Sequence, residues 1–214
     1  KVHRGVFFFS IVIERHMSKN NKSNSDVWMA YNNSMRTTRA SIALNSLVKN
    51  FQIIRDFCKS DTKVCAVVKA NAYGHGMVAI AHALEKIGVD YLAVALVEEG
   101  IKLRDAGIKT PLLVLGGISH SGASIAMHYD MTITISSIEK LDSLVREAAQ
   151  LHKVPRIHMK IDTGMGRIGV QYDRSIPFLT KVAEYHHAGK ILCEGIYSHF
   201  AESTDEEYTR LQYD

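Results

Sequence analysis

The sequence predicts an α/β fold, a TIM-like (β/α)8 barrel of which about six βα units are present. Short apolar runs alternate six times with helical patterns over short connections, which is typical of right-handed βαβ units in a parallel sheet. No G-x-G-x-x-G sequence follows the first run, which counts against a doubly wound dinucleotide-binding sheet. In the fifth predicted strand Arg156, His158 and Lys160 share one face. A polar face on a strand covered on both sides indicates a barrel interior that serves a site.

The expected elements begin with an amphipathic helix, because apolar residues from Ile42 to Phe57 recur at helical spacing. Six short apolar runs predict strands over residues 64–68, 91–96, 112–115, 131–135, 156–161 and 192–198. Helical stretches lie between them, near residues 77–87, 97–106, 120–128, 138–151 and 174–187. Residues 203–207 have the character of a capping box, and Tyr208, Leu211 and Tyr213 begin another helical pattern before the chain stops.

Residues 1–37 differ from the rest, and we expect a disordered leader ahead of a barrel domain over residues 38–214. The net charge is +4, but residues 1–39 hold seven of the 26 Lys and Arg residues and only two of the 22 Asp and Glu. The other 175 residues carry 19 basic and 20 acidic side chains. This nearly neutral body excludes nucleic acid binding through a basic surface. Met17 is a candidate for the true start of translation.

Neither a membrane span nor a disulfide framework is expected. The apolar run from Val6 to Ile13 is too short to cross a bilayer, and Glu14 follows it without a small-residue cleavage site. Three cysteines are too few for a disulfide scaffold and indicate a reducing compartment, so we expect the cytoplasm. The 11 histidines show no metal-ligand spacing, and no metal is expected.

Lys69 directly follows the first apolar strand, which is where barrels place catalytic residues. A lone lysine at such a point more often extends into solvent. If the site is partly desolvated, the pKa of the amine falls below about 10.4, and the amine can act as a Schiff-base nucleophile and as a base. Gly74 and Gly76 then allow the backbone to approach an anion beside a helix start.

Three segments resemble signatures of bacterial alanine racemases, enzymes of fold type III that depend on pyridoxal 5'-phosphate (PLP). They are VKANAYGHG at residues 68–76, KIDTGMGRIG at 160–169 and EGIYSHFA at 194–201, in the family's order and each at a predicted strand end. The resemblance extends from about Thr38 to the C-terminus. It implies an isomerase that interconverts L-alanine and D-alanine through a PLP aldimine by two-base proton exchange, supplying D-alanine for cell-wall peptidoglycan.

The resemblance also implies roles for individual residues. Lys69 matches the lysine that binds PLP and exchanges the α-proton on the D-alanine side, and Tyr73 matches the tyrosine at the cofactor phosphate. Arg167 matches the arginine that contacts the cofactor's phenolic oxygen and the substrate carboxylate, a task suited to a guanidinium group. Lys160 matches a lysine that is often carboxylated, as N6-carboxylysine, and positions that arginine. His199 matches the histidine that supports the pyridine side through a neighbouring arginine.

In this family the second base is a tyrosine from a C-terminal β-domain of the partner subunit, so the resemblance implies a homodimer for the full-length protein. A complete barrel takes about 250 residues, and we expect that the last βα units and the β-domain are missing here. The 214-residue chain alone is therefore expected to be inactive. Two alternatives stay open. One is a non-catalytic PLP-binding barrel of the kind that serves PLP homeostasis, and the other is another amino-acid racemase of the same fold.

Overall fold

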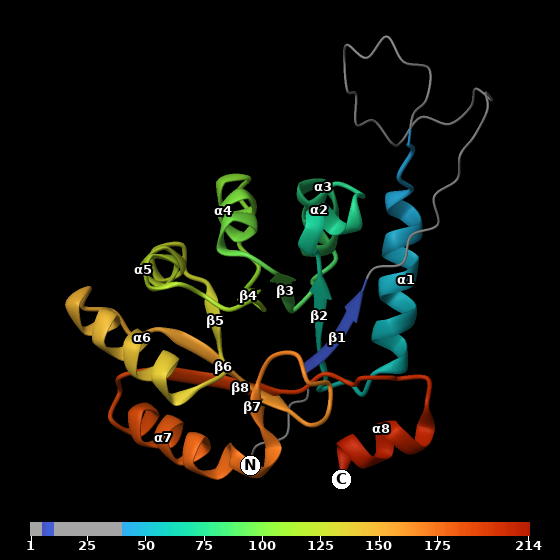
Figure 1. Cartoon of the computed structure of the whole chain (residues 1–214). Coiled ribbons are helices and arrows are strands. Elements are labelled where there is room, and N and C mark those ends of the chain that lie inside the picture. The colour runs from blue at the N-terminus through green and yellow to red at the C-terminus, as the bar shows by residue number, and fades with distance from the viewer. Residues whose placement is uncertain (1–5, 11–39) are drawn as a thin grey trace, which may run out of the picture. The chain divides into compact units, whose positions relative to one another are not determined.

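A computed structural model describes residues 6–10 and 40–214 of the chain (Figure 1). The chain divides into two compact units. The first comprises the residues up to Ala93 together with Asp105–Thr110, and the second comprises Val94–Arg104 and Pro111–Asp214. Of the leader expected over residues 1–37, only the strand Val6–Ser10 belongs to the described residues. The expected boundary at residue 38 and the candidate start at Met17 lie outside them.

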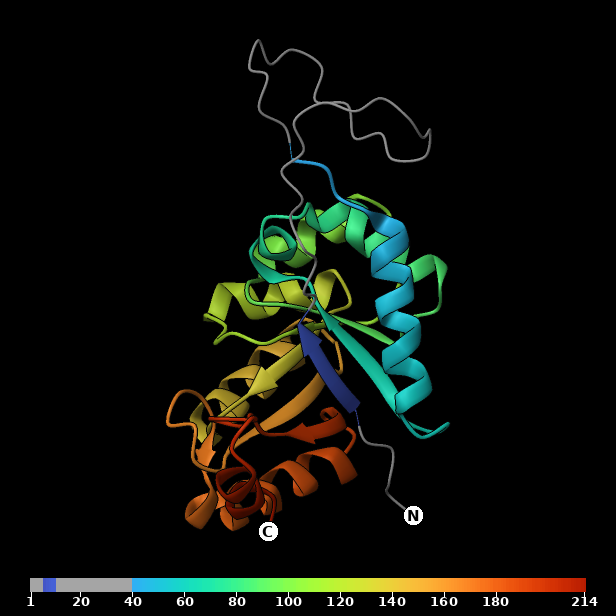
Figure 2. The same cartoon turned by 90° about the vertical axis from the view of Figure 1, so that its right-hand side faces the viewer.

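The first unit contains three parallel strands of the sheet and the helices beside them. Its elements are β1 (Val6–Ser10), α1 (Leu44–Phe57), β2 (Lys63–Val67), α2 (Lys69–Tyr73), α3 (Met77–Lys86) and β3 (Tyr91–Val94, whose last residue falls in the second unit). β2 pairs in parallel with β1 and with β3, and Figure 2 shows β1 lying along β2. β2 is buried from Val64 onward, as expected for a strand covered on both faces. The apolar side of α1 contributes Leu47 and Phe51 to the core.

The second unit is built around β6. Its elements are α4 (Val97–Asp105, whose last residue falls in the first unit), β4 (Leu112–Val114), α5 (His120–His128), β5 (Thr132–Ile135), α6 (Ile138–Gln150), β6 (Arg156–Asp162), β7 (Val170–Gln171), the 3-10 turn η1 (Tyr172–Arg174), α7 (Ser175–His187), β8 (Leu192–Tyr197) and α8 (Glu206–Tyr213). β6 pairs in parallel with β5 and β8 and, at its carboxyl end, with β7, while β4 pairs with β5. At its carboxyl end β6 therefore lies between β7 and the end of β8.

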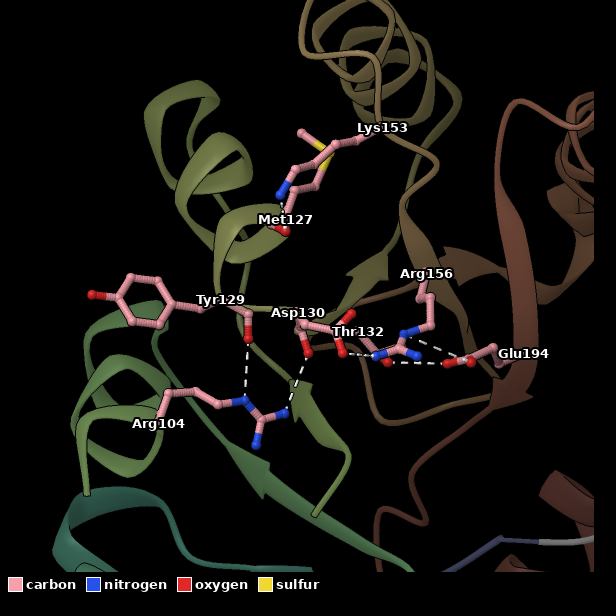
Figure 3. A network of polar contacts seen from close by, with 8 residues as sticks. All are labelled: Arg104, Met127, Tyr129, Asp130, Thr132, Lys153, Arg156 and Glu194. Atoms are coloured by element: carbon pink, nitrogen blue, oxygen red, sulfur yellow. Dashed lines mark hydrogen bonds and ion pairs between the residues drawn. The ribbon is translucent and has the colours of Figure 1, made fainter. Parts of the chain in front are cut away.

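The polar face expected on β6 is confirmed. At the amino end of the strand Arg156 forms an ion pair with Asp130 at 2.5 Å and lies 3.9 Å from the carboxylate of Glu194 on β8 (Figure 3). Glu194 also accepts a hydrogen bond from the Thr132 hydroxyl at 3.0 Å. These contacts link β5, β6 and β8 at the amino end of β6, although the buried Nε of Arg156 makes no hydrogen bond to any described residue. Lys160 lies near the other end, at which the candidate site is located.

The predicted strands and helices are all present, with ends within two residues of those expected. The strand expected over residues 91–96 ends at Val94, because the N–H groups of Ala95 and Leu96 donate to the Glu99 carboxylate at 2.8 and 3.2 Å and begin α4. The final helical pattern forms α8, capped by Asp205. β1, β7 and the turn α2 were not expected. Among the described helices, none has the length and apolar character needed to cross a membrane.

Candidate active site

Lys69 stands at the carboxyl end of β2 and begins an unusual turn. The four residues that follow it, Ala70 to Tyr73, have positive φ values of 51–55°, so α2 is a left-handed turn. Each non-glycine residue in this conformation costs roughly 1–2 kcal/mol. The buried residue Ala72 anchors the turn, and its N–H donates to the Val68 carbonyl at 2.8 Å. Backbone strain of this kind is concentrated at functional sites.

The turn leads directly into α3 and brings several anion-binding groups onto one short segment. Gly74 and Gly76, with φ values of 85° and 94°, continue the left-handed path at no steric cost. Asn71 Oδ1 accepts a hydrogen bond from the N–H of Met77 at 2.9 Å, which fixes the turn against the first residue of α3. The amino end of a helix carries partial positive charge and favours anions. Tyr73, on the same turn, is 37% exposed.

Lys160, in the second unit, is a buried lysine, only 6% exposed. Its ammonium group lies 4.5 Å from the centre of the Tyr197 ring on β8, and the Tyr197 hydroxyl lies 2.8 Å from the Thr134 hydroxyl on β5. Burial and then the positive charge of Arg167 lower the pKa of Lys160 to about 8, against the opposing effect of Asp162. Near neutral pH a fraction of Lys160 is therefore an uncharged, nucleophilic amine.

Arg167 is exposed and lies in the loop over residues 163–169 that follows β6. Asp162 organises this loop, because its Oδ1 accepts hydrogen bonds from the N–H groups of Gly164 and Gly166, each at 3.0 Å. Burial raises the pKa of Asp162, but these bonds and one from the Arg167 N–H hold it below its ordinary value. Gly169 is required for a close approach, since a Cβ there would lie 2.5 Å from the Asp162 backbone nitrogen. The loop is thus built around one carboxylate.

His199 is exposed and follows β8 by two residues. Its carbonyl accepts a hydrogen bond from the side chain of Gln212 on α8 at 3.2 Å. The sequence alone does not identify Gln212, Thr134 or Tyr197 as residues of the site. Tyr197 lies within the third matching segment, which is the one signal that could have identified it. Gln212 and Thr134 are ordinary residue types whose contacts become visible only in three dimensions.

The five candidate residues fall into two groups. Lys69 and Tyr73 share one turn in the first unit, and Lys160, Arg167 and His199 lie at or beyond the carboxyl ends of β6 and β8 in the second. Parallel α/β barrels gather catalytic residues at these strand ends. Within the first group, an amine and a phenol can hold an anionic cofactor, and within the second a guanidinium group can hold a carboxylate. In the part of the chain that the structure describes, no three His, Cys, Asp or Glu side chains are grouped to hold a metal ion.

Comparisons with known proteins find related sequences and structures. The family model "Alanine racemase, N-terminal domain" matches residues 42–214. The alanine racemase of Halothermothrix orenii is 40% identical over 181 residues, which cover 84% of this chain and 47% of that protein. Alanine racemase 2 of Caldanaerobacter subterraneus subsp. tengcongensis is 43% identical over 183 residues, which cover 84% of this chain and 46% of that protein.

A solved structure is similar as well. That of the alanine racemase of Clostridium difficile 630 in complex with cycloserine matches with a TM-score of 0.75 and 38% identity, covering 79% of this chain and 47% of that one. The chain therefore spans about half the length of the relatives it matches. Its fold is the incomplete TIM-like barrel that the sequence predicts.

Proposed function

Because the chain belongs to the family of the alanine racemase N-terminal domain, we propose that the whole protein is a PLP-dependent racemase that interconverts L-alanine and D-alanine. The observation that carries this proposal is the position of Lys69. It begins a strained left-handed turn at the carboxyl end of a buried strand, directly before two glycines and a helix start. An amine in that position can hold an aldehyde cofactor whose phosphate lies beside the helix start.

The residues of this turn fit PLP by their chemistry. Lys69 supplies a primary amine, Tyr73 supplies a phenol that can donate to a phosphate, and the amino end of α3 favours an anion. When bound, PLP withdraws electrons from the substrate's α-carbon and acidifies its proton. Lys69 takes up and returns that proton on the D-alanine side.

Arg167 and Lys160 act on the substrate side of the site. The Arg167 guanidinium would bind the substrate carboxylate and, with PLP bound, would also hold the phenolic oxygen of the cofactor. The uncharged amine of Lys160 adds to CO₂, so that an N–C bond forms, one amine proton passes to solvent and a carbamate anion results. This anion replaces the repulsion between Lys160 and Arg167 by attraction and so positions the guanidinium.

The remaining parts of the proposal follow from the family resemblance. His199 supports the pyridine side of the cofactor. The second base is a tyrosine of a partner subunit, so the active form is a homodimer. The enzyme works in the cytoplasm, where it supplies D-alanine for peptidoglycan.

The proposal is tested by racemisation of L-alanine by the whole protein with PLP, with D-alanine measured by chiral chromatography. We expect D-alanine to accumulate until the two enantiomers are equal. Lys69→Ala should abolish this, whereas Lys59→Ala, at an exposed position, should leave it intact. PLP binding without turnover would identify a non-catalytic PLP-binding barrel. Turnover of another amino acid but not of alanine would identify a different racemase, and either outcome overturns the proposal.

A further inference from the structure

Gln212 is a buried amide on an otherwise exposed helix. Its exposed fraction is 9%, whereas the fractions for its neighbours Leu211 and Tyr213 are 70% and 82%. Asp205 caps the amino end of α8 by accepting a hydrogen bond from the N–H of Tyr208 at 2.8 Å. The short helix is thereby fixed where it begins, and Gln212 is the residue that it buries.

Every polar group of the Gln212 side chain has a partner. Its Oε1 accepts from the N–H of Ala201 at 2.7 Å, and its Nε2 donates to the His199 carbonyl at 3.2 Å and to the Thr163 hydroxyl at 3.0 Å. The orientation of the amide is determined, because an N–H can only donate and a carbonyl can only accept. Since Thr163 accepts from Gln212, its own hydroxyl hydrogen is available to the Ser198 hydroxyl at 2.6 Å.

Two segments that are far apart in the sequence meet at this amide. Thr163 opens the loop that carries Arg167, while residues 199–201 follow β8. The same loop rests on α8 at a second point, where the Tyr208 hydroxyl donates to the Gly164 carbonyl at 3.4 Å. A Cβ at Gly164 would lie 3.5 Å from the Gln212 side chain, so loop and amide are in close contact. Because the loop is rich in glycine, its backbone depends on such contacts to remain in one conformation.

We propose that Gln212 is a positioning residue that holds the Arg167 loop and the His199 segment in one fixed arrangement. The proposal rests on the proposed function in so far as Arg167 and His199 are the side chains that meet substrate and cofactor. Gln212 acts through them and carries no reacting atom. Without the amide, the N–H of Ala201, the carbonyl of His199 and the hydroxyl of Thr163 lose their hydrogen bonds to Gln212. The Arg167 loop and the His199 segment are therefore destabilised together.

Hydrogen exchange of the 214-residue chain, followed by mass spectrometry of its peptides, tests this role. Gln212→Met removes the amide and keeps the length of the side chain. We expect residues 163–169 and 198–203 both to exchange roughly tenfold faster than in the wild type, as for the loss of about one net hydrogen bond. Residues 138–150 of α6 should keep their rate. The matched control Gln150→Met, at an exposed position, should change neither segment.

Gln212→Glu adds a readout that depends on pH. The ionised carboxylate can accept from Ala201 but cannot donate to His199 or Thr163, whereas the protonated acid regains one donor. After correction for intrinsic exchange rates, protection of both segments should return as the pH falls through the titration of this glutamate. The charged or titratable residues on the segments around it are Asp162, Arg167, His199, Glu202, Asp205, Glu206, Glu207, Tyr208, Arg210, Tyr213 and Asp214 with its terminal carboxylate. The wild-type profile measures their contribution.

The result for Gln212→Met is judged by which segments exchange faster. If Gln212→Met accelerates exchange in neither segment, or in only one of them, the proposal is overturned. If it accelerates exchange throughout the chain, α6 included, the Gln212→Glu profile decides: protection that returns on acidification supports the proposal, and a flat profile overturns it. No turnover is needed for any of these measurements. A protein that fails to racemise alanine would therefore defeat the proposed function without obscuring this result.

Discussion

Replacing Lys160 by methionine should change how the stability of the chain depends on pH. In the folded chain the pKa of Lys160 is about 8, against an ordinary 10.5, because the side chain is buried and Arg167 is near. The unfolded chain therefore binds this proton more tightly than the folded chain. Unfolding takes up a proton between these two values, so the free energy of unfolding decreases as the pH falls from 10.5 to 8.

The size of the effect follows from the two pKa values. The fall from 10.5 to about 8, at about 1.36 kcal/mol for each pKa unit, corresponds to about 3 kcal/mol. Above pH 10.5 the amine is neutral in the folded and in the unfolded chain, so Lys160 does not destabilise the fold through its charge. Below pH 8 the amine is charged in both states, and the folded chain is destabilised by the full amount. Methionine has a similar length and no proton to take up. We expect Lys160→Met to lose this part of the pH dependence and to be the more stable variant, relative to wild type, at neutral pH.

The assay is denaturant unfolding followed by circular dichroism across this pH range. The buffers should be depleted of CO₂, because a carbamate on Lys160 would remove the titrating amine. Lys102→Met, at an exposed position on α4, is the matched control and should follow the wild type. If Lys160→Met and the wild type show the same pH dependence, burial does not lower the pKa of Lys160, and the reasoning is refuted.

Three further predictions concern the surroundings of Lys160 and Arg167. Gly169→Ala places a Cβ 2.5 Å from the Asp162 backbone nitrogen and should lower the free energy of unfolding, measured with denaturant, by about 3 kcal/mol or more. Gly166→Ala has open space around the new Cβ but a φ of +71°, so it should lower that free energy by only about 1 kcal/mol. Equal losses of stability in the two variants would contradict the clash at Gly169. Thr134→Val removes the hydroxyl 2.8 Å from that of Tyr197 and should cost about 1 kcal/mol by the same assay, and unchanged stability would argue against this bond. Asp162 stabilises the folded chain through its lowered pKa, and this contribution is present above the ordinary pKa of 3.8 and is lost as the pH falls through the lowered pKa. Asp162→Asn should therefore make the free energy of unfolding depend less on pH in that acidic range. An Asp162→Asn variant with the pH dependence of the wild type would contradict this prediction.

The pattern of apolar and polar residues along the sequence was sufficient to predict several strands. The apolar run at residues 64–68 forms β2, and the alternation of polar and apolar residues at 156–161 forms β6, because both patterns are typical of strands. The alternation did not report burial, since His158 and Lys160 on the polar face of β6 are buried as fully as Ile157 and Ile161. The end of β3 could not be predicted in the same way. It depends on whether Glu99 captures two backbone N–H groups, which apolar pattern does not report.

The candidate site was predictable to the level of strand ends. Lys69 could be placed there because it directly follows an apolar run, and Lys160 because it lies near the end of the alternating run at residues 156–161. The left-handed path of Ala70 to Tyr73 could not, since three of these four residues seldom adopt positive φ and the conformation is imposed by contacts of the folded chain. Gln212 was equally hidden. Its burial comes from two loops that lie distant in sequence, and neither helical spacing nor residue type distinguishes it from an exposed glutamine.

The identity of the lysine that binds the cofactor can be measured directly. PLP is added to saturation, the protein is reduced with borohydride, and the pyridoxyl group is located by peptide mass spectrometry. We predict that Lys69 is the principal modified residue and that the label disappears from that peptide in Lys69→Ala without a change elsewhere. A principal label on another lysine, or no label at saturating PLP, would contradict the assignment of Lys69 and with it the proposed racemase chemistry.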